Sequence, residues 1–290
     1  MLNKQVWIKQ ILENFYPDDS FLKKSVNYSG FVENNRIHVA SVGIDPNVLI
    51  NNTTYPINVV GRDDFDNEIV LDKFETENTI VRRPEAIEYS YDKLESVISQ
   101  HRATLRKSVA TKAAHAYAPD VDTEQTPIVS TTGTSYNGRK RICFADILTL
   151  KERFDDAEIP LDERYLVLNP KHVSDLLLED IELFKDLTNI KDGEPFKFAG
   201  FGCFSFSHTP HYNLVDGKLQ KVAFNTVKKD TCFSSIAFYA KEVMRADGNI
   251  YMYSTVDDPK ERATIVGFDK RFVALPIRNK GIGAIVSDKS

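Results

Sequence analysis

The residues with the clearest chemical potential lie in CFSFSHTPH, at positions 203–211. Cys203, His208 and His211 could bind zinc, because thiolate and imidazole are its usual protein ligands. A structural zinc site needs four ligands in closely spaced pairs, and no second pair lies nearby. We therefore expect His208 and His211 on a solvent-exposed loop, and we predict no bound metal or cofactor.

The same segment could serve a small α/β hydrolase, with Cys203 as nucleophile and His208 as its base. The cysteines have apolar or aromatic neighbours, however, as in Cys143-Phe144 and Cys232-Phe233. This setting is typical of buried thiols. Their odd number and wide spacing also argue against a disulfide framework. The pattern favours reduced cysteines in a core.

A strand, a sharp turn and a helix are predicted in ERYLVLNPKHVSDLLLED, at positions 163–180. Many active sites use this arrangement, but the turn holds no nucleophile, and the chain has neither a Gly-x-Ser-x-Gly nor a Walker A sequence. Asn169 suits a helix N-cap and Pro170 the first helical position, so we interpret the turn as scaffold. We expect His172 to be exposed and the leucines at 176–178 to face the core.

Composition limits the class of protein. The chain has 290 residues, 42% of them hydrophobic, which suits one large domain or two small ones. Its net charge of −5 argues against a generally basic nucleic-acid binder, although one face could still be basic. No apolar run approaches the length of a membrane span. The first residues, MLNKQVWIKQILENFY, do not resemble a signal peptide.

The first 56 residues predict an extended arm. Ile8, Ile11, Leu12 and Phe15 have helical spacing, so a short amphipathic helix should begin the chain. Residues 18–56 then carry only brief apolar runs. A segment of this length without periodicity fits poorly inside a compact domain. We expect it to find its partners elsewhere.

A charged hairpin is predicted over residues 57–88. Three β-type runs, at 59–60, 69–71 and 79–81, alternate with mainly acidic stretches. The charged positions are Arg62, Asp63, Asp64, Asp66, Glu68, Asp72, Lys73, Glu75, Glu77, Arg82 and Arg83. A two-stranded ribbon is marginal alone in water, so we expect it to lie on another surface.

A very long helix is predicted from about residue 90 to 117. Leu94, Val97, Ile98, Leu105 and Val109 form an apolar stripe. About 27 residues would reach roughly 40 Å, far beyond the usual helix. Its second half carries Arg102, Arg106, Lys107 and Lys112. These cations could simply suit a helix C-terminus, or they could face nucleic acid.

The rest of the chain mixes helices and strands. We expect a linker or loop at 119–140, a helix at 145–154 and a strand pair with a glycine turn in EPFKFAGFGCFSFSHTP. The segment SSIAFYAKEVMRA, at 234–246, is either helical or begins as a strand. Several β runs end the chain, with a charged loop at 257–261.

The order of these parts resembles the HK97-fold major capsid proteins of tailed bacteriophages. RYLVLNPKHVSDLLLED, AGFGCFSFSHTP, SSIAFYAKEVMRA and DDPKERATIVGFDKRFVALPIRNKGIGAIV carry the likeness, which covers nearly the whole chain. It is nearest to coat proteins of Bacteroides-type phages or prophages. The resemblance implies an α+β capsid fold. Its parts would be an N-terminal arm (1–56), an E-loop hairpin (57–88), a peripheral domain with a spine helix (89–119 and 246–275) and an axial domain (120–245 and 276–290).

The resemblance also implies a structural protein of the virion, not an enzyme. Hexamers and pentamers of the chain would form an icosahedral shell around double-stranded DNA, together with a portal and with a separate scaffold or auxiliary protein. Some members of the family form Lys–Asn crosslinks, for which Lys73 would be the candidate. An encapsulin-type compartment with a protein cargo is the alternative with the same fold. The residues expected at subunit contacts are Ile8, Ile11, Leu12, Phe15, Arg62, Asp63, Asp64, Asp66, Glu68, Lys73, Glu75, Arg82, Arg83, Asp257, Asp258, Lys260 and Glu261.

Overall fold

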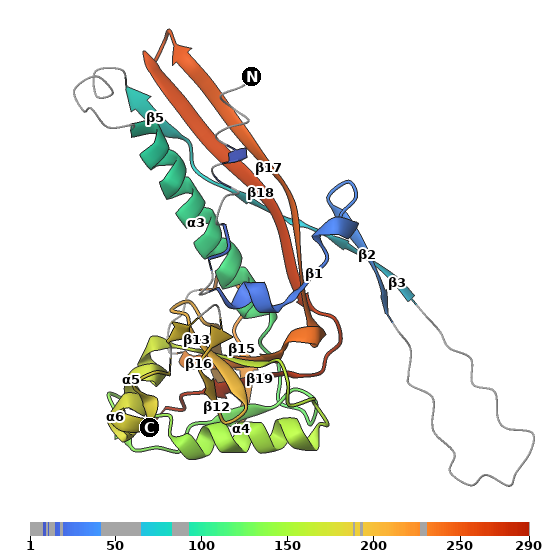
Figure 1. Cartoon of the computed structure of the whole chain (residues 1–290), viewed down its shortest axis with the longest axis vertical. Coiled ribbons are helices and arrows are strands. Elements are labelled where there is room, and N and C mark those ends of the chain that lie inside the picture. Colours follow the sequence, from blue (N-terminus) through green and yellow to red (C-terminus); the bar gives the residue numbers. More distant parts are fainter. Residues whose placement is uncertain are drawn as a thin grey trace, which may run out of the picture.

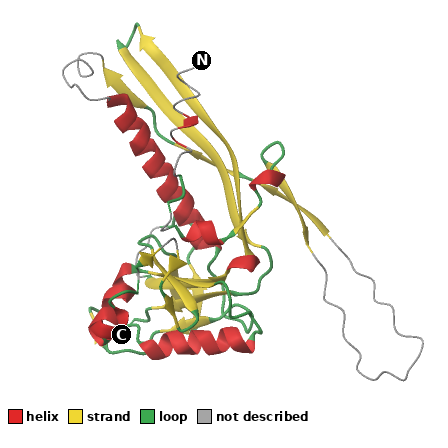
Figure 2. Cartoon of the chain, in the orientation of Figure 1, coloured by secondary structure: helices red, strands yellow, loops and turns green. Residues whose placement is uncertain are grey.

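The computed structural model describes residues 8, 9, 11, 15–17, 20–41, 65–82, 93–187, 189–191, 194–226 and 231–289. They form an elongated part, in which a long helix lies along long strands, and a compact part at one end of it (Figure 1). A two-stranded ribbon projects from the side of the elongated part (Figure 2). The chain passes between the two main parts repeatedly, so neither is one continuous segment.

The elongated part consists of helix α3 (Lys93–Ala116) packed on one sheet. The strand order is β1, β17, β18 and β4, and β5 pairs with another stretch of β18. The strands are β1 (Val26–Asn27), β17 (Val243–Asp258), β18 (Ala263–Pro276), β4 (Asp72–Glu75) and β5 (Thr79–Arg82). The predicted stripe on the helix is confirmed, since Val97, Leu105 and Val109 are buried in one cluster with Val266 and Phe268 of β18.

The N-terminal segment packs into this same core. It contains the 3₁₀ helices η1 (Phe21–Lys24) and η2 (Ser29–Phe31). Ile11 is fully buried and Phe15 is 4% exposed, in the cluster that contains the α3 stripe. The expectation that these two side chains bury between subunits is therefore wrong, because the chain's own core covers them. Ile8 is half-buried against the cluster, and Leu12 lies outside the described residues.

The projecting ribbon pairs β2 (Arg36–Ser41) with β3 (Phe65–Val70) in antiparallel register. The predicted hairpin within residues 57–88 is therefore wrong in its pairing. The partner of β3 comes from the predicted arm, while β4 and β5 both pair with β18. Ile37 and Leu71 anchor the base of the ribbon in a small cluster with Ala246 and Val273. Strand-forming patterns identify strands, but they leave the choice of partner open.

The compact part is built on an eight-stranded sheet. The order is β12, β13, β9, β16, β14 and β15, and β19 joins β6 to β16. Its strands are β6 (Ile128–Ser130), β9 (Arg164–Leu168), β12 (Lys197–Phe198), β13 (Phe201–Ser205), β14 (His211–Val215), β15 (Lys218–Lys221), β16 (Cys232–Tyr239) and β19 (Ile282–Val286). The other elements here are α4 (Phe144–Asp156), α5 (Pro170–Glu179), α6 (Ile181–Phe184), η3 (Ala240–Glu242) and the strand pairs β7 (Ser135–Tyr136) with β8 (Arg139–Lys140) and β10 (Ile190–Lys191) with β11 (Glu194–Pro195).

The predicted strand, turn and helix at 163–180 are confirmed as β9 and α5. The Asn169 side chain accepts a hydrogen bond from the backbone N–H of Lys171, and Pro170 begins the helix. Of the three leucines that follow, Leu176 is buried but Leu178 is 68% exposed. The expectation that all three face the core is wrong, because consecutive helical residues point about 100° apart.

The structure also corrects the expectations for residues 119–140 and 234–246. Residues 119–140 are more than a linker, because β6 lies parallel to β19 in the central sheet and Ile128 is buried. The segment at 234–246 continues β16 through η3 into β17, so the helical alternative is wrong. A short apolar run fits a buried strand and a buried helix equally well. No helix in the described ranges is long and apolar enough to cross a membrane.

Candidate assembly surfaces

The ribbon holds part of the predicted contact set. Glu68 on β3 forms an ion pair with Arg36 on β2. Asp66 lies on the same strand, opposite Ala40 in the backbone register. The predicted contact residues that lie outside the described residues are Leu12, Arg62, Asp63, Asp64 and Arg83. The ribbon is thus charged, and its Arg36 and Glu68 pair with each other.

Lys73 and Glu75 lie on β4, at an edge of the elongated sheet, and not on the ribbon. Lys73 forms an ion pair with Glu75, and its ammonium lies 3.5 Å from a carboxylate oxygen of Asp269 on β18. The hydrogen bond to Glu75 raises the pKa of Lys73. Asp269 is only 3% exposed and accepts a hydrogen bond of 3.1 Å from the Tyr253 hydroxyl. Lys73 therefore already stabilises its own sheet.

The turn between β17 and β18 lies at the far end of the elongated part (Figure 1). The Asp258 carboxylate accepts a hydrogen bond of 2.8 Å from the backbone N–H of Lys260. Arg82 of β5 lies 3.5 Å from the Glu261 carboxylate and so ties the turn to the sheet edge. The side chain of Asp257 is outside the described set. The turn presents an exposed Lys260 in a fixed local conformation.

The basic side chains of α3 differ in whether they form an ion pair. The segment 96–117 contains no carboxylate; its cations are Arg102, Arg106, Lys107 and Lys112. The Lys112 ammonium lies 3.2 Å from the Asp72 carboxylate of β4, so that charge is partly neutralised. Lys107 is exposed and Arg106 half-buried, and neither forms an ion pair within the described ranges. Arg106 and Lys107 therefore carry the free positive charge of this face.

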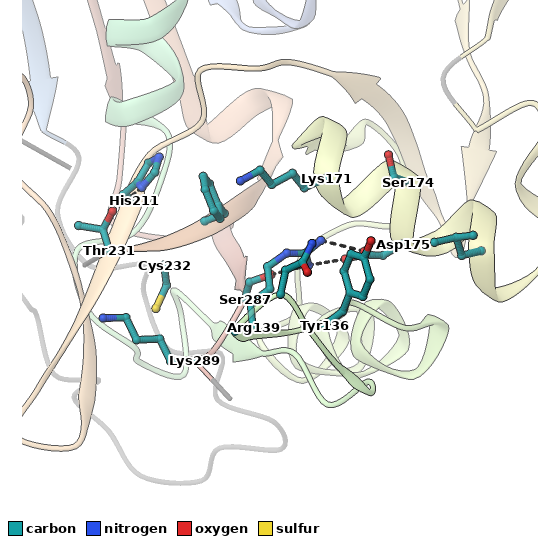
Figure 3. Close-up of a pocket in the computed structure, with 14 residues that line it drawn as sticks. Tyr136, Arg139, Lys171, Ser174, Asp175, His211, Thr231, Cys232, Ser287 and Lys289 are labelled. Atoms are coloured by element: carbon teal, nitrogen blue, oxygen red, sulfur yellow. Dashed lines mark hydrogen bonds and ion pairs between the residues drawn. The ribbon is translucent and has the colours of Figure 1, made fainter. Parts of the chain in front are cut away.

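A pocket of about 680 Å³ lies beside α5 in the compact part, and we call it the α5 pocket (Figure 3). Its wall includes the β7–β8 hairpin, α5, β16 and the end of the chain. The Arg139 guanidinium donates two hydrogen bonds, of 2.5 and 2.9 Å, to the two carboxylate oxygens of Asp175, which is 3% exposed. The exposed Lys171 and Lys289 also line the pocket.

His172 contacts the pocket-lining Ser287 and is fully buried, so the expectation that it is exposed is wrong. Its ring nitrogens lie 2.6 Å from the Ser235 hydroxyl and 2.8 Å from the Ser287 hydroxyl. Burial lowers the pKa of His172 to about 4, with Asp175 raising it and Arg139 lowering it further. Both serines are buried as well. The three side chains hold α5 against β16 and the end of β19, and they offer no nucleophile to solvent.

The two chemical interpretations of CFSFSHTPH lack the geometry they need. Cys203 is fully buried, and burial raises the pKa of its thiol to about 12, so a reactive thiolate does not form near neutral pH. His208 and His211 are half-buried, which corrects the expected exposed loop. His211 lies 2.6 Å from the Thr231 hydroxyl. Within the described residues, no cluster of three metal-binding side chains occurs.

Sequence reasoning missed the α5 pocket. Arg139 and Lys289 are far apart in the chain but lie opposite each other in an isolated β-bridge. In the sequence, Asp175 has the pattern of an ordinary polar helix residue. Only the structure shows its ion pair with Arg139. No spacing in the sequence links these residues, because the pairing of distant segments brings them together.

Solved structures resemble this chain, although its sequence matches no family model. No protein-family model and no curated protein matches the sequence. The structure is similar to the capsid of cyanophage P-SCSP1u, with 14% identity, a TM-score of 0.64 and coverage of 92% of this chain and 87% of that one. The structure is also similar to the mature capsid of bacteriophage PhiM1, with 12% identity, a TM-score of 0.61 and coverage of 92% of this chain and 86% of that one. A virus-like particle from Pyrococcus furiosus is similar as well, with 12% identity, a TM-score of 0.58 and coverage of 98% of this chain and 100% of that one.

These similarities extend through both parts of the molecule and leave little of any of the three chains unmatched. The predicted fold class is therefore confirmed. The chain has the mixed α+β fold of the HK97-like capsid proteins over about nine-tenths of its length.

Proposed function

We propose that this chain is a major capsid protein, whose copies assemble into an icosahedral shell that encloses double-stranded phage DNA. Its role is structural and not enzymatic. The fold supports this proposal, because phage capsid structures match it over most of their length and its own. The raised pKa of the buried Cys203 thiol argues against the alternative of an enzyme that uses Cys203 as nucleophile.

The ribbon is the observation that carries the proposal. Among the described strands, β2 and β3 pair with each other and with no further strand, and they project from the body of the molecule (Figure 2). A lone two-stranded ribbon is marginally stable in water. Contact with a neighbouring copy would complete it, as in other interfaces where extended segments lie on a second chain. Obligate interfaces of this kind supply stability that the monomer lacks.

Each part of the molecule then has a proposed place. The ribbon would be the E-loop, α3 with the elongated sheet the spine helix and peripheral domain, and the compact part the axial domain. The turn with Asp258, Lys260 and Glu261 would meet other copies at local three-fold contacts. Hexamers, pentamers, a portal and a separate scaffold or auxiliary protein are further parts of the proposal, as is an origin in Bacteroides-type phages.

A compartment with a protein cargo is the second candidate. The similarity to the virus-like particle from Pyrococcus furiosus, which is matched over its full length, favours keeping it. The two candidates differ in what the shell contains. The free charges of Arg106 and Lys107 favour DNA, since a shell around DNA faces a dense array of phosphates.

The test is expression of the full chain, alone and with the other proteins of its genomic neighbourhood. Electron microscopy and sedimentation would detect rings and closed shells. Nuclease-protected DNA inside shells would support the capsid, whereas a co-purifying protein cargo would favour the compartment. A chain that stays monomeric under both conditions at high concentration would contradict the proposal.

A further inference from the structure

The α5 pocket carries positive charge that the chain itself does not neutralise. The Lys171 ammonium lies 3.3 Å from the ring centre of Phe233, and its pKa is lowered by burial and by Arg139. Neither Lys171 nor Lys289 forms an ion pair within the described part of the chain. Asp175 is the only carboxylate in the wall, and the Arg139 fork occupies it. Figure 3 shows Cys232 between the two lysines in this view.

The pocket also has an apolar rim. Leu178 of α5 lines it and is 68% exposed, an unusual position for leucine unless something covers it. Tyr136, on the opposite hairpin, is 47% exposed. An occupant of this pocket should therefore combine an apolar side chain with carboxylates.

Such a combination occurs in the same chain, at the C-terminal end of α4 and in the loop that follows it. Leu161 is 63% exposed, and Asp156 and Glu158 are exposed beside it in sequence. Within the described residues, neither carboxylate forms an ion pair. We call Asp156, Glu158 and Leu161 the acidic knob.

The acidic knob is held in one conformation. The buried Arg164 donates a hydrogen bond of 2.9 Å to the carbonyl oxygen of Pro160 and another to that of Ile159. It also forms an ion pair of 2.7 Å with Asp155. Ile159 is buried below the loop. The flanking contacts therefore present Leu161 outward on a rigid base, as expected of a pre-organised contact.

The knob and the pocket lie at opposite ends of α4. The backbone N–H of Phe144, at the first turn, donates a hydrogen bond of 2.9 Å to Glu179 of α5, next to the pocket. The knob begins with Asp156, the last residue of α4, and continues into the loop beyond it. A helix of this length spans about 20 Å. One copy cannot fill its own pocket with its own knob. Two different surfaces that complement each other on successive copies form a head-to-tail contact, which closes into a ring when the rotation permits.

We propose that the acidic knob of one copy inserts into the α5 pocket of the next copy, and that this contact forms the rings from which the shell is built. Leu161 packs against Leu178 and the neighbouring apolar wall, while Asp156 and Glu158 pair with Lys171 and Lys289. This inference rests on the proposed function, since it assigns the contact within the proposed rings. The occupant is a second copy of this chain because it supplies both the charge and the apolar group.

The experiment uses charge reversal in the full-length chain. The pocket variant carries Lys171→Glu and Lys289→Glu, and the knob variant carries Asp156→Lys and Glu158→Lys. Each alone places like charges opposite one another, so the assembled fraction should fall at least about tenfold. The four substitutions in one chain should restore assembly. Lys197→Glu with Lys218→Glu is the matched control, since both lysines are exposed, on β12 and β15, and neither lines the pocket.

An equimolar mixture of the two variants gives a sharper result. The pocket variant is acidic at both its knob and its pocket, and the knob variant is basic at both. In a ring where the two variants alternate, every contact therefore pairs opposite charges. Alternation requires an even number of copies. The mixture should therefore form six-membered rings but neither five-membered rings nor closed shells. Native mass spectrometry measures the number of copies, and circular dichroism checks that each variant is folded.

The outcomes separate the two proposals. Normal shells from both variants would overturn the knob-and-pocket contact and leave the proposed function standing. Loss of assembly that neither the variant with all four substitutions nor the mixture restores would also overturn the inference, because the two surfaces would then not pair with each other. A wild-type chain that never assembles would contradict the proposed function and this contact with it.

Discussion

The ammonium group of Lys270 lies 2.6 Å from a carboxylate oxygen of Asp247, and the lysine side chain is only 2% exposed. Lys270 is on β18 and Asp247 on β17, next to an irregularity in the register between these strands. The ring of Phe15 covers the ammonium, with 4.6 Å between the nitrogen and the ring centre. Tyr16 donates a hydrogen bond to the same carboxylate. The N-terminal segment thus covers a buried ion pair of its own sheet.

Replacing Lys270 with Met should leave Asp247 without its cation and lower the free energy of unfolding by about 3 kcal/mol. The double variant Lys270→Met with Asp247→Asn should recover much of this loss, because it removes the uncompensated charge. Urea denaturation of the monomer measures both. Lys241→Met is the control, since its partners Asp162 and Glu163 are exposed and the loss should be under about 1 kcal/mol. Equal losses at both sites would contradict the argument.

Truncating the N-terminal apolar side chains should destabilise the isolated chain. Ile11→Ala or Phe15→Ala removes a buried side chain from the main cluster, at a cost of roughly 2–5 kcal/mol. Ile8→Ala, at a half-buried position, should cost less. Thermal unfolding of unassembled protein provides the measurement. An unchanged melting temperature combined with failed assembly would instead place these side chains between subunits.

The stability of the compact part should depend on pH through His172. Its pKa is about 4 in the folded chain, against 6.5 for an ordinary histidine. As pH falls from 6.5 to 4, the unfolded chain binds a proton that the folded chain does not, so stability falls by up to about 3 kcal/mol and then levels off. The His172→Gln variant should lack this component. Parallel stability curves for the two proteins across that range would show that His172 does not contribute it.

Gly283 of β19 should tolerate no side chain. A Cβ there would lie 2.7 Å from the Phe154 ring and 3.1 Å from Leu150, both on α4. Gly283→Val should therefore cost at least about 1–3 kcal/mol through overpacking. Gly30→Ala is the control, because a Cβ at that position meets nothing within 4 Å. Similar unfolding midpoints for the two variants would argue against close packing of α4 on the sheet.

The free cations of α3 should influence packaged DNA if they face it. Arg106→Glu with Lys107→Glu should reduce the nuclease-protected DNA in shells, and the difference from the wild-type chain should shrink as ionic strength rises, because salt screens these contacts. Lys112→Glu would disturb the ion pair with Asp72 as well, so it is a poorer test. Fluorescence of a DNA-binding dye per particle measures the content. Unchanged content in normally formed shells would assign the cations to the helix C-terminus alone.

Local elements of this protein follow from its sequence. The stripe that includes Val97, Leu105 and Val109 identified α3, because only one face of a helix meets the sheet. Asn169 and Pro170 identified the start of α5, because the cap satisfies backbone groups within three residues. The order of such elements also led to the fold class, since a fold is largely a sequence of local structures with fixed connections.

Only the tertiary structure decided which distant segments meet. The sequence alone did not predict that β3 pairs with β2, that Ile11 and Phe15 are buried in the chain's own core, or that His172 of α5 is buried against Ser287. Each of these depends on the register and packing of strands far apart in the chain, and the same local pattern is compatible with several partners. For the same reason, the sequence predicted helices, strands and their charges, whereas the α5 pocket and the acidic knob emerged only from the folded chain.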